Sequence, residues 1–505
     1  AEYEELVNIQ GALEETMKLP KFVTRAFWII NVLVLSIGFC GAAGAQSQQT
    51  VKQLQQLIEQ QQKQLEAQQR ALEEQTRALR NLRNRVETLT QEESAVEVKA
   101  EAAERLAEEA VRKAQEAKAE ADRAHREALA VDVQKEEDLH RTEGKTFHIP
   151  ETKTVVTLSG FIKADVIHDF DKIESPYKFA ARRIAVNGDS SDEPSSRTTV
   201  TANASRFVIA SATPTDYGKL STFFSFDAAE NTTSSDPDFR FRQGWGQLDD
   251  IFWGGALRAG QSWSSWDDVP ALPETMDFEG PNGSQQTRQG LVRWEREFQK
   301  KYTLWVSIEN PNYSIQNGKE KSAWPDTIAS LNWHGDWGHL KPAVIGRQLQ
   351  GDNDDGGDDD TAFGWGAQLA GDIKVPLLAK KDNFKFQAVY GAGIGSYNND
   401  GGIDDAVFDG SDLKAIKSFQ GYGAFQHWWT DSLRSNAVFG YVDVDTRNQQ
   451  PSDTLERTMY FAGNLVWSPI DHMDIGAEFL WGKRENKNGD DGDATRLQFS
   501  TKFLF

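Results

Sequence analysis

One break in composition divides this chain into two parts that must fold by different rules. Between Gln46 and Glu143 the sequence contains no glycine, no proline and no aromatic residue, whereas all three are frequent from Phe147 onward. A segment without turn formers favours one continuous helix, and a segment rich in them favours many short elements. We therefore expect a long helical region followed by a region of another fold class.

Within 46–131, apolar residues recur every seven positions in one register. With Val51 at position a, eleven of twelve a positions and nine of twelve d positions are apolar. This strict repeat predicts a left-handed α-helical coiled coil. Gln61, Gln68 and Gln75 occupy three consecutive d positions, where polar layers commonly fix register or strand number. We interpret 46–131 as a coiled-coil trimerisation stalk; the alternative is a single solvated helix, above all in the second half, where alanine fills the seam.

The first 45 residues have the features of an export signal. Three basic residues follow Met17, an apolar stretch covers 26–39, and the small residues 43–45 form a cleavage site. We expect 17–45 to be a signal peptide and 1–16 to be upstream over-translation before the true start. A membrane anchor is the alternative, although the apolar stretch is shorter than the roughly 20 residues that a spanning helix needs. Cys40 leaves a lipoprotein as a further alternative.

From residue 154 onward the sequence has a period of two. In 156–166 the even positions are apolar or small and most odd positions are polar, which is typical of strands with two different faces. Short and long links between these strands alternate along the chain. The short links lie near 213–218, 249–250, 298–301, 334–338, 375–383, 429–434 and 468–472. The long links lie near 170–198, 231–238, 263–287, 311–323, 351–360, 397–414, 446–455 and 485–493.

Eight long and seven short links separate sixteen strands. Short turns at one rim and long loops at the other are the pattern of an outer-membrane barrel. We therefore predict an all-β transmembrane barrel of about 16 antiparallel strands over 154–505, joined to the stalk by a linker at 132–153. The alternating end of the chain, 497–505, which finishes on Phe505, supports assembly in the bacterial outer membrane. Several tryptophans near expected strand ends suit a ring at the membrane surface; they are Trp253, Trp263, Trp294, Trp305, Trp333, Trp337, Trp467 and Trp481.

Strand periodicity also indicates which charged side chains face the lumen. Arginines alternate with apolar residues in the second to sixth expected strands, so their side chains should point inward. These arginines are Arg206, Arg240, Arg242, Arg258 and Arg293. We expect them to form the pore constriction, because selectivity comes from like charges at the narrowest point. The alternative is that each arginine simply solvates a wide lumen and is neutralised by Asp227 and its neighbours.

The long link 263–287 is the candidate for a loop that folds into the lumen opposite these arginines. It carries a set of carboxylates that would face the basic side chains, namely Asp267, Asp268, Glu274, Asp277 and Glu279. The whole chain has a net charge of −22, which argues against a nucleic-acid partner. Exposed loop charges are screened beyond about 8 Å at physiological salt, so the local sign at the constriction should decide selectivity.

The order of signal peptide, Gln-rich then Ala-rich coil and a barrel that opens at 156–165 resembles the DcaP-like porins. The resemblance covers roughly 46–505 and implies a homotrimeric, sixteen-stranded channel for small anionic solutes such as dicarboxylates. Phosphate-selective and sugar-type porins share much of this architecture and remain alternatives. The resemblance places the barrel in the outer membrane of a Gram-negative bacterium, in contact with lipid and lipopolysaccharide, with the coil in the periplasm.

Other functions are less well supported by the sequence. No nucleophile elbow, H-E-x-x-H motif or Cys/His cluster is present, so we predict no enzyme activity and no cofactor. The acidic run 352–360 is read as a solvated loop tip rather than a metal site. An envelope-tethering protein, with a plugged barrel and a stalk that reaches peptidoglycan, is an alternative function. A trimeric adhesin is disfavoured because both ends of the barrel should be periplasmic.

Overall fold

The computed structural model describes residues 71–81, 105, 108–118, 144–188, 194–229, 237–321, 324–353 and 359–505. The chain divides into two compact units, 1–120 and 121–505. In the first unit, 71–81 and 108–118 are helical, as the heptad pattern predicts. The expected signal peptide, the over-translated start and most of the expected coil lie outside the described residues. No described helix is both long and apolar enough to cross a membrane.

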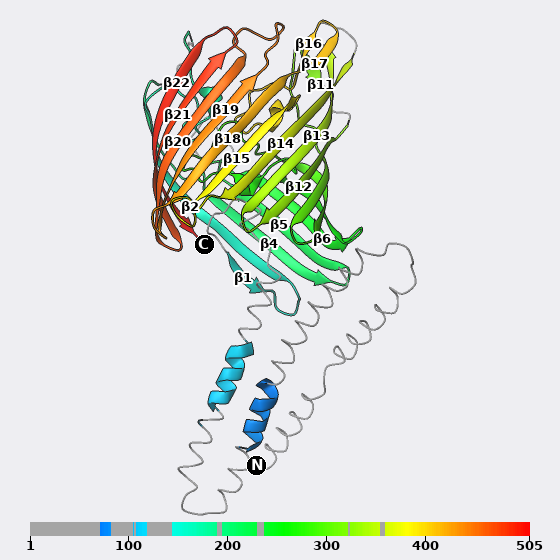
Figure 1. Cartoon of the computed structure of the whole chain (residues 1–505), viewed down its shortest axis with the longest axis vertical. Helices are drawn as coiled ribbons and strands as arrows, with labels where there is room; N and C mark the ends of the chain where they lie inside the picture. The colour runs from blue at the N-terminus through cyan, green and yellow to red at the C-terminus, as the bar shows by residue number, and fades with distance from the viewer. Residues whose placement is uncertain are drawn as a thin grey trace, which may run out of the picture. The chain divides into compact units, whose positions relative to one another are not determined.

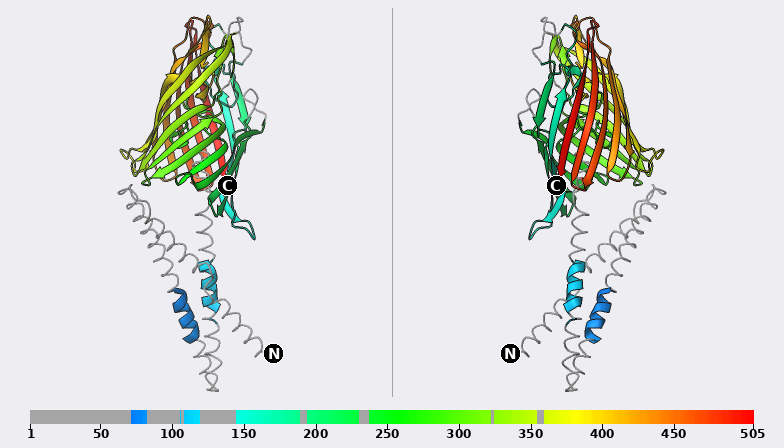
Figure 2. Two further views of the ribbon diagram at one scale, coloured as in Figure 1. Left: turned by 90° about the vertical axis from the view of Figure 1, so that its right-hand side faces the viewer. Right: turned by 90° about the vertical axis from the view of Figure 1, so that its left-hand side faces the viewer.

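The second unit is a closed antiparallel barrel of 16 strands (Figures 1 and 2). The strands are β2 (Val155–Asp169), β4 (Arg206–Thr215), β5 (Gly218–Asp227), β6 (Arg240–Ile251), β7 (Gly255–Trp263), β8 (Arg288–Phe298), β9 (Tyr302–Glu309), β12 (Asp326–Gly335), β13 (Gly338–Asn353), β14 (Asp360–Lys374), β15 (Asn383–Ala392), β18 (Lys417–Trp428), β19 (Leu433–Val444), β20 (Leu455–Ile470), β21 (Met473–Asn486) and β22 (Asp491–Leu504). The barrel closes where β2 pairs with β22 through Phe161↔Leu504 and with β4 through Phe161↔Arg206. Strand number and the alternation of short and long links are therefore as predicted.

Shorter elements decorate this barrel. They are β1 (Lys145–His148), β3 (Arg197–Thr201), β10 (Ile315–Gln316), β11 (Gly318–Glu320), β16 (Ala406–Asp409), β17 (Asp412–Ala415) and the 3-10 turns η2 (Ala181–Arg183), η3 (Val269–Ala271) and η4 (Gly395–Tyr397). Strand β1 pairs with β2 through Lys145↔Leu158. The segment 132–153, which the sequence analysis treats as a linker, thus includes an additional strand of the barrel sheet.

Along the strands of the barrel, apolar side chains face outward and polar side chains face inward, the reverse of a soluble protein. In β15, Phe384 and Tyr390 are 39% and 48% exposed on the outer face, whereas Lys385 and Gln387 are buried on the inner face. Apolar side chains outside and polar side chains inside are what a lipid-embedded barrel requires. The inner polar groups are therefore available to hold loops that enter the lumen.

Two of the eight tryptophans expected at the membrane surface lie elsewhere. Trp253 is 81% exposed at the turn after β6, and Trp467 is 49% exposed near the end of β20, as the surface ring requires. The side chains of Trp263 and Trp305 instead lie next to lumenal cations, with Arg288 4.4 Å from the Trp263 ring and Arg293 4.0 Å from the Trp305 ring. Position near a strand end did not reveal which face each indole occupies.

Candidate functional site: the lumen and its folded loop

The segment 264–287 between β7 and β8 lies against inner faces of the barrel. Side chains of distant strands donate hydrogen bonds to it: Gln368 Nε2 to the Trp266 carbonyl at 2.6 Å, Lys385 Nζ to the Leu272 carbonyl at 2.8 Å, Tyr422 Oη to the Ala271 carbonyl at 2.9 Å, and Lys163 Nζ to the Met276 carbonyl at 2.6 Å. These donors come from β14, β15, β18 and β2. The polar inner faces therefore satisfy loop carbonyls that would otherwise be buried without partners.

Small residues let the loop lie flush with the wall. Gly283 has φ +76°, and a Cβ there would stand 2.6 Å from the Gly421 nitrogen of β18. A Cβ at Gly440 of β19 would stand 2.3 Å from Asn282 Oδ1. Asn282 Nδ2 donates to Thr458 Oγ1 of β20 at 2.6 Å. Glycine at these positions is thus required for the close approach of loop and barrel.

Four of the five loop carboxylates contact basic side chains other than the five predicted arginines, and the fifth accepts a backbone N–H. Glu274 accepts a hydrogen bond from Arg434 Nε at 2.6 Å, and Asp268 lies 2.9 Å from His339 Nε2. Asp277 lies 3.7 Å from Arg496 Nη1, and Glu279 lies 3.4 Å from Lys178 Nζ. Asp267 accepts a hydrogen bond from the Thr287 N–H at 2.9 Å. Burial raises the pKa of Asp277 to about 6, although the nearby guanidinium of Arg496 favours its charged form. These carboxylates therefore anchor the loop.

Two of the five predicted arginines meet a carboxylate of their own wall. Arg240 Nη2 and Arg242 Nη1 lie 2.7 and 2.8 Å from the same oxygen, Asp227 Oδ2. Asp227 is only 1% exposed, and β5 pairs it directly with Arg240. The expected row of five lumenal arginines thus contains one cluster in which a carboxylate offsets part of the positive charge.

All five predicted arginines lie near aromatic rings, and for Arg240 and Arg242 these rings are Phe278 at 5.4 Å and Trp263 at 5.8 Å. The guanidinium carbon of Arg258 is 3.7 Å from the Trp245 ring centre, that of Arg293 is 4.0 Å from the Trp305 ring and that of Arg206 is 5.5 Å from the Phe161 ring. Arg258 also donates to Gln247 Oε1 at 2.9 Å, and Arg293 lies 3.4 Å from Glu295. An aromatic face attracts a cation without cancelling its charge.

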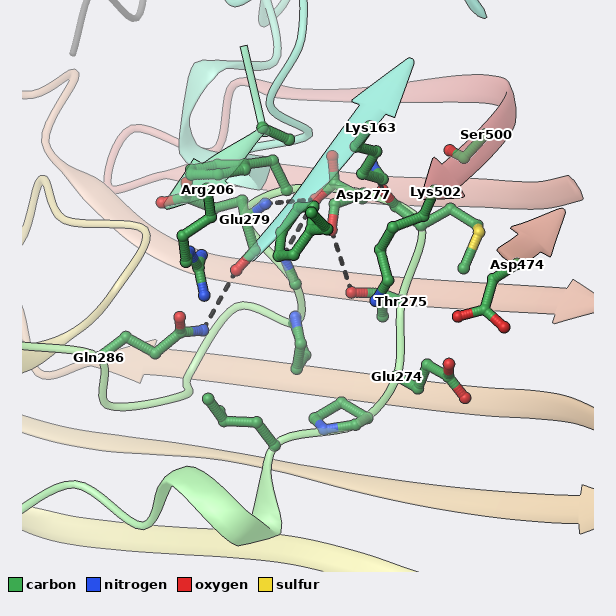
Figure 3. Close-up of a pocket in the computed structure, with 18 residues that line it drawn as sticks. Lys163, Arg206, Glu274, Thr275, Asp277, Glu279, Gln286, Asp474, Ser500 and Lys502 are labelled. Carbon is green, nitrogen blue, oxygen red and sulfur yellow. Dashed lines mark hydrogen bonds between the residues drawn. The ribbon is translucent and has the colours of Figure 1, made fainter. Parts of the chain in front are cut away.

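A cavity of about 120 Å³ lies between the loop and the seam of β2, β4 and β22. Figure 3 shows Lys163, Arg206 and Lys502 from the barrel with Glu274 and Glu279 from the loop. Lys163 pairs with Asp165 at 2.7 Å, and Lys502 lies over the same Phe161 ring as Arg206, 5.0 Å from its centre. The cavity therefore has three basic side chains and Asp474 of β21 on the wall side, and acidic side chains on the loop side.

A second cavity of about 360 Å³ adjoins the first half of the loop. Arg258, Arg293 and Lys341 line it, and Lys341 Nζ lies 4.2 Å from the Trp305 ring on which Arg293 also rests. Asp267 and Asp268 line its loop side. Both cavities thus place wall cations across a lumenal space from loop carboxylates. Within the described parts of the chain, no group of three or more His, Cys, Asp and Glu side chains could hold a metal ion.

Sequence reasoning missed the cations that hold the loop. Arg434 and Arg496 are 1% and 0% exposed on the inner faces of β19 and β22. Periodicity applied to the last strand would have placed Arg496 inward, since Gln498 and Ser500 share its face and Phe499 is 52% exposed. Arg347 is also buried, and its guanidinium lies between Asp326 at 2.9 Å and Asp405 at 3.1 Å.

A closed sixteen-stranded barrel with an apolar outer face and a loop folded across its charged lumen defines an outer-membrane porin. The sequence model described as DcaP outer membrane protein matches residues 94–505, and the chain belongs to this family.

Several solved structures are similar to this chain. The outer membrane channel DcaP of Acinetobacter baumannii is 20% identical, with a TM-score of 0.62 over 71% of this chain and 99% of that one. OmpT of Vibrio cholerae is 12% identical, with a TM-score of 0.45 over 71% and 99% of the two chains. The anion-selective porin of Comamonas acidovorans is 12% identical, with a TM-score of 0.44 over 70% and 100%. No curated protein sequence matches the chain.

Proposed function

We propose that this porin passes small hydrophilic solutes by passive diffusion and prefers anions. The observation that carries the proposal is the set of wall cations backed by aromatic rings, above all Arg206 and Arg258, which line the two lumenal cavities. Guanidinium groups stay charged at every physiological pH and offer forked donors to carboxylate and phosphate oxygens. Arg240 and Arg242 pair with Asp227, and Arg206 lies directly opposite Asp227 across β4 and β5, so this carboxylate offsets part of the positive charge of these three arginines.

The solute class is proposed from the family resemblance. Dicarboxylates carry two groups that guanidinium donors can bind, and the resemblance to DcaP-like porins favours them; phosphate and sugars remain the alternatives. Because loop carboxylates face the same cavities, binding should be shallow enough for release.

The test of this proposal is the zero-current potential of the purified protein in a salt gradient across a planar bilayer. We expect a steady open channel whose potential has the sign of anion preference, and added succinate should reduce the chloride current. A cation-preferring potential would contradict the proposal. A barrel without a steady conductance would instead favour the envelope-tethering alternative with a plugged lumen.

We further propose that the protein is a homotrimer whose stalk lies in the periplasm. Leu72 and Leu79, both at a positions of the predicted coil, are 63% and 43% exposed in the single chain, as expected of seam residues that await partner helices. Deletion of 46–131 should slow assembly yet leave a pore-forming barrel. Native mass spectrometry of both proteins tests this, and a monomer with and without the coil would refute it.

A further inference from the structure

Besides 264–287, a second loop enters the lumen. The segment 170–196 follows β2, and Phe179, Ala181 and Ile184 of this loop are buried in one cluster with Tyr460 and Leu480 on the inner faces of β20 and β21. The rings of Phe179 and Tyr460 lie 6.0 Å apart. The described part of this loop that follows β2, 170–188, is thus packed inside the barrel rather than spread over the rim.

A third loop enters from another part of the wall. The segment 393–405 follows β15, and its Ile394 and Tyr397 are buried with Trp266 of the loop 264–287. Tyr397 Oη donates to Asp326 of β12 at 2.9 Å, and Asn398 Nδ2 donates to Gln420 of β18 at 2.9 Å. These contacts fix the base of the loop 393–405 to inner faces far from β2.

The second and third loops meet at Arg182 and Asp400. The Arg182 N–H donates to Asp400 Oδ2 at 3.0 Å, and Arg182 Nε donates to the Asp400 carbonyl and lies 3.8 Å from Asp400 Oδ1. Gly401 and Gly402 follow with φ +68° and +73°, and a Cβ at Gly402 would stand 2.8 Å from Arg182 Cδ. Two left-handed glycines therefore shape the loop 393–405 around the side chain of Arg182.

This junction rests on the loop 264–287. Lys178 lies 3.4 Å from Glu279, and Asn399 Nδ2 donates to the Glu279 carbonyl at 3.0 Å. The Phe179 N–H donates to Asp277 Oδ1 at 2.9 Å. One short stretch of the loop 264–287 thus supports both of the other loops, so the three segments form a single connected structure inside the lumen.

We propose that Arg182 and Asp400 join the segments 170–188 and 393–405 into a strap that limits the size of solutes, as a second restriction beside that of the loop 264–287. This inference rests on the proposed function as a diffusion channel. Arg182 acts here as a positioning residue: it holds the loop 393–405 and need not touch the solute. The strap belongs to the rim of long loops, which faces the exterior of the cell.

The test is the swelling of liposomes that contain the purified protein, in a neutral monosaccharide and in a neutral trisaccharide. Neutral sugars separate size from charge selectivity. In Arg182→Ala the trisaccharide rate relative to the monosaccharide rate should rise about fivefold, the factor that corresponds to one lost hydrogen bond. The matched control is Arg183→Ala at the next residue, whose guanidinium lies 2.9 Å from Glu174 of its own loop and which should keep the wild-type ratio.

A second pair of variants guards against a folding defect in Arg182→Ala. Asp400→Ala opens the same junction from the other loop and should raise the ratio in the same way. In Arg182→Cys/Asp400→Cys, oxidation to a disulfide should restore the low ratio and reduction should raise it. A wild-type ratio in Arg182→Ala, in a protein that passes the monosaccharide, overturns the strap alone. A wild-type protein that passes neither sugar overturns the proposed diffusion function and the strap together.

Discussion

Two parts of the barrel wall carry inner-facing arginines but use them differently. In β13–β15 and β18–β22, the anchoring wall, Arg434 and Arg347 are paired with buried carboxylates and hold loops. In β4–β9, the arginine wall, Arg206 and Arg258 lie on aromatic rings and line cavities. An inward-facing arginine is therefore not by itself a selectivity residue. Where a buried carboxylate pairs with it, the arginine stabilises the fold; where none does, its charge can act on a passing solute.

Most strands of the anchoring wall are also longer than those of the arginine wall. Strands of the arginine wall have 8–12 residues, whereas those of the anchoring wall have 10–16. A tilted strand needs about 9–11 residues to cross a bilayer, so many anchoring strands extend beyond it. The added length provides inner surface on which the segments 170–188 and 393–405 pack.

The largest expected effect follows from breaking an anchoring pair. Glu274→Ala leaves the Arg434 guanidinium, which is 1% exposed, without its two-oxygen partner and with only the more distant Asp474 carboxylate at 3.4 Å. Loss of one member of a buried pair costs about 3–5 kcal/mol in the free energy of unfolding. Urea unfolding in detergent measures this. Asp431→Ala, which removes a fully exposed partner of Lys381, is the control and should unfold like the wild type. Equal effects would contradict the anchoring role.

The closure of the strap by Arg182 and Asp400 should depend on pH. Burial raises the pKa of Asp400 to about 7, against the opposing effect of Arg182 and with smaller contributions from Glu279 and Arg183. A hydrated Asp400 in an opened strap would have a pKa near 4, so the closed strap binds the proton more tightly. Closure is therefore favoured at low pH and weakened as pH rises through about 7.

The swelling rate in the trisaccharide relative to that in the monosaccharide should accordingly rise between about pH 6 and about pH 8, by less than tenfold per pH unit. Asp400→Asn keeps a neutral side chain and should show a low ratio at both values. Liposome swelling at the two pH values measures this effect. A ratio that falls with rising pH, or a step that persists in Asp400→Asn, would show that Asp400 does not control the strap.

The smallest effect is expected from removing an aromatic support on the arginine wall. Trp245→Leu takes away the ring 3.7 Å from Arg258 but leaves the hydrogen bond to Gln247. A cation–π contact of this kind contributes about 1 kcal/mol, so anion preference should weaken by no more than about fivefold. Trp365→Leu on the lipid-facing side is the control, and its zero-current potential should not change. A larger shift in the control would place the aromatic effect outside the lumen.

Much of the fold could be predicted because a membrane barrel is encoded by patterns between neighbouring residues in the sequence. Alternating polarity indicates the two faces of each strand, and the alternation of link lengths located the strands within a few residues. The inward orientation of Arg206 and Arg258 followed from the same rule. The rule fails at a bulge: the register between β5 and β6 shifts between Ser225 and Phe226, so that Arg242 and Gln243, neighbours in sequence, are both buried.

Contacts across the lumen could not be predicted from the sequence. The loop 264–287 was identified by its length and carboxylates, yet its ion pairs with Arg434 and Arg496 join residues some 160 to 220 positions apart, a relation that no local pattern encodes. The entry of the segments 170–188 and 393–405 was missed for a related reason. Their buried residues, such as Phe179 and Ile394, lie in irregular segments without a period.

The most direct test of the central claim compares two double variants of the arginine wall by their zero-current potentials in a KCl gradient. Arg206→Gln/Arg258→Gln removes two charges that line the cavities. Asp227→Asn/Arg240→Gln removes one charge of each sign from the paired cluster. The account predicts that the first variant lowers the anion-to-cation permeability ratio about fivefold per charge, as expected for about 1 kcal/mol at 4 Å in a water-like medium, while the second keeps the wild-type ratio. An unchanged ratio in the first variant, or an equal shift in both, would contradict it.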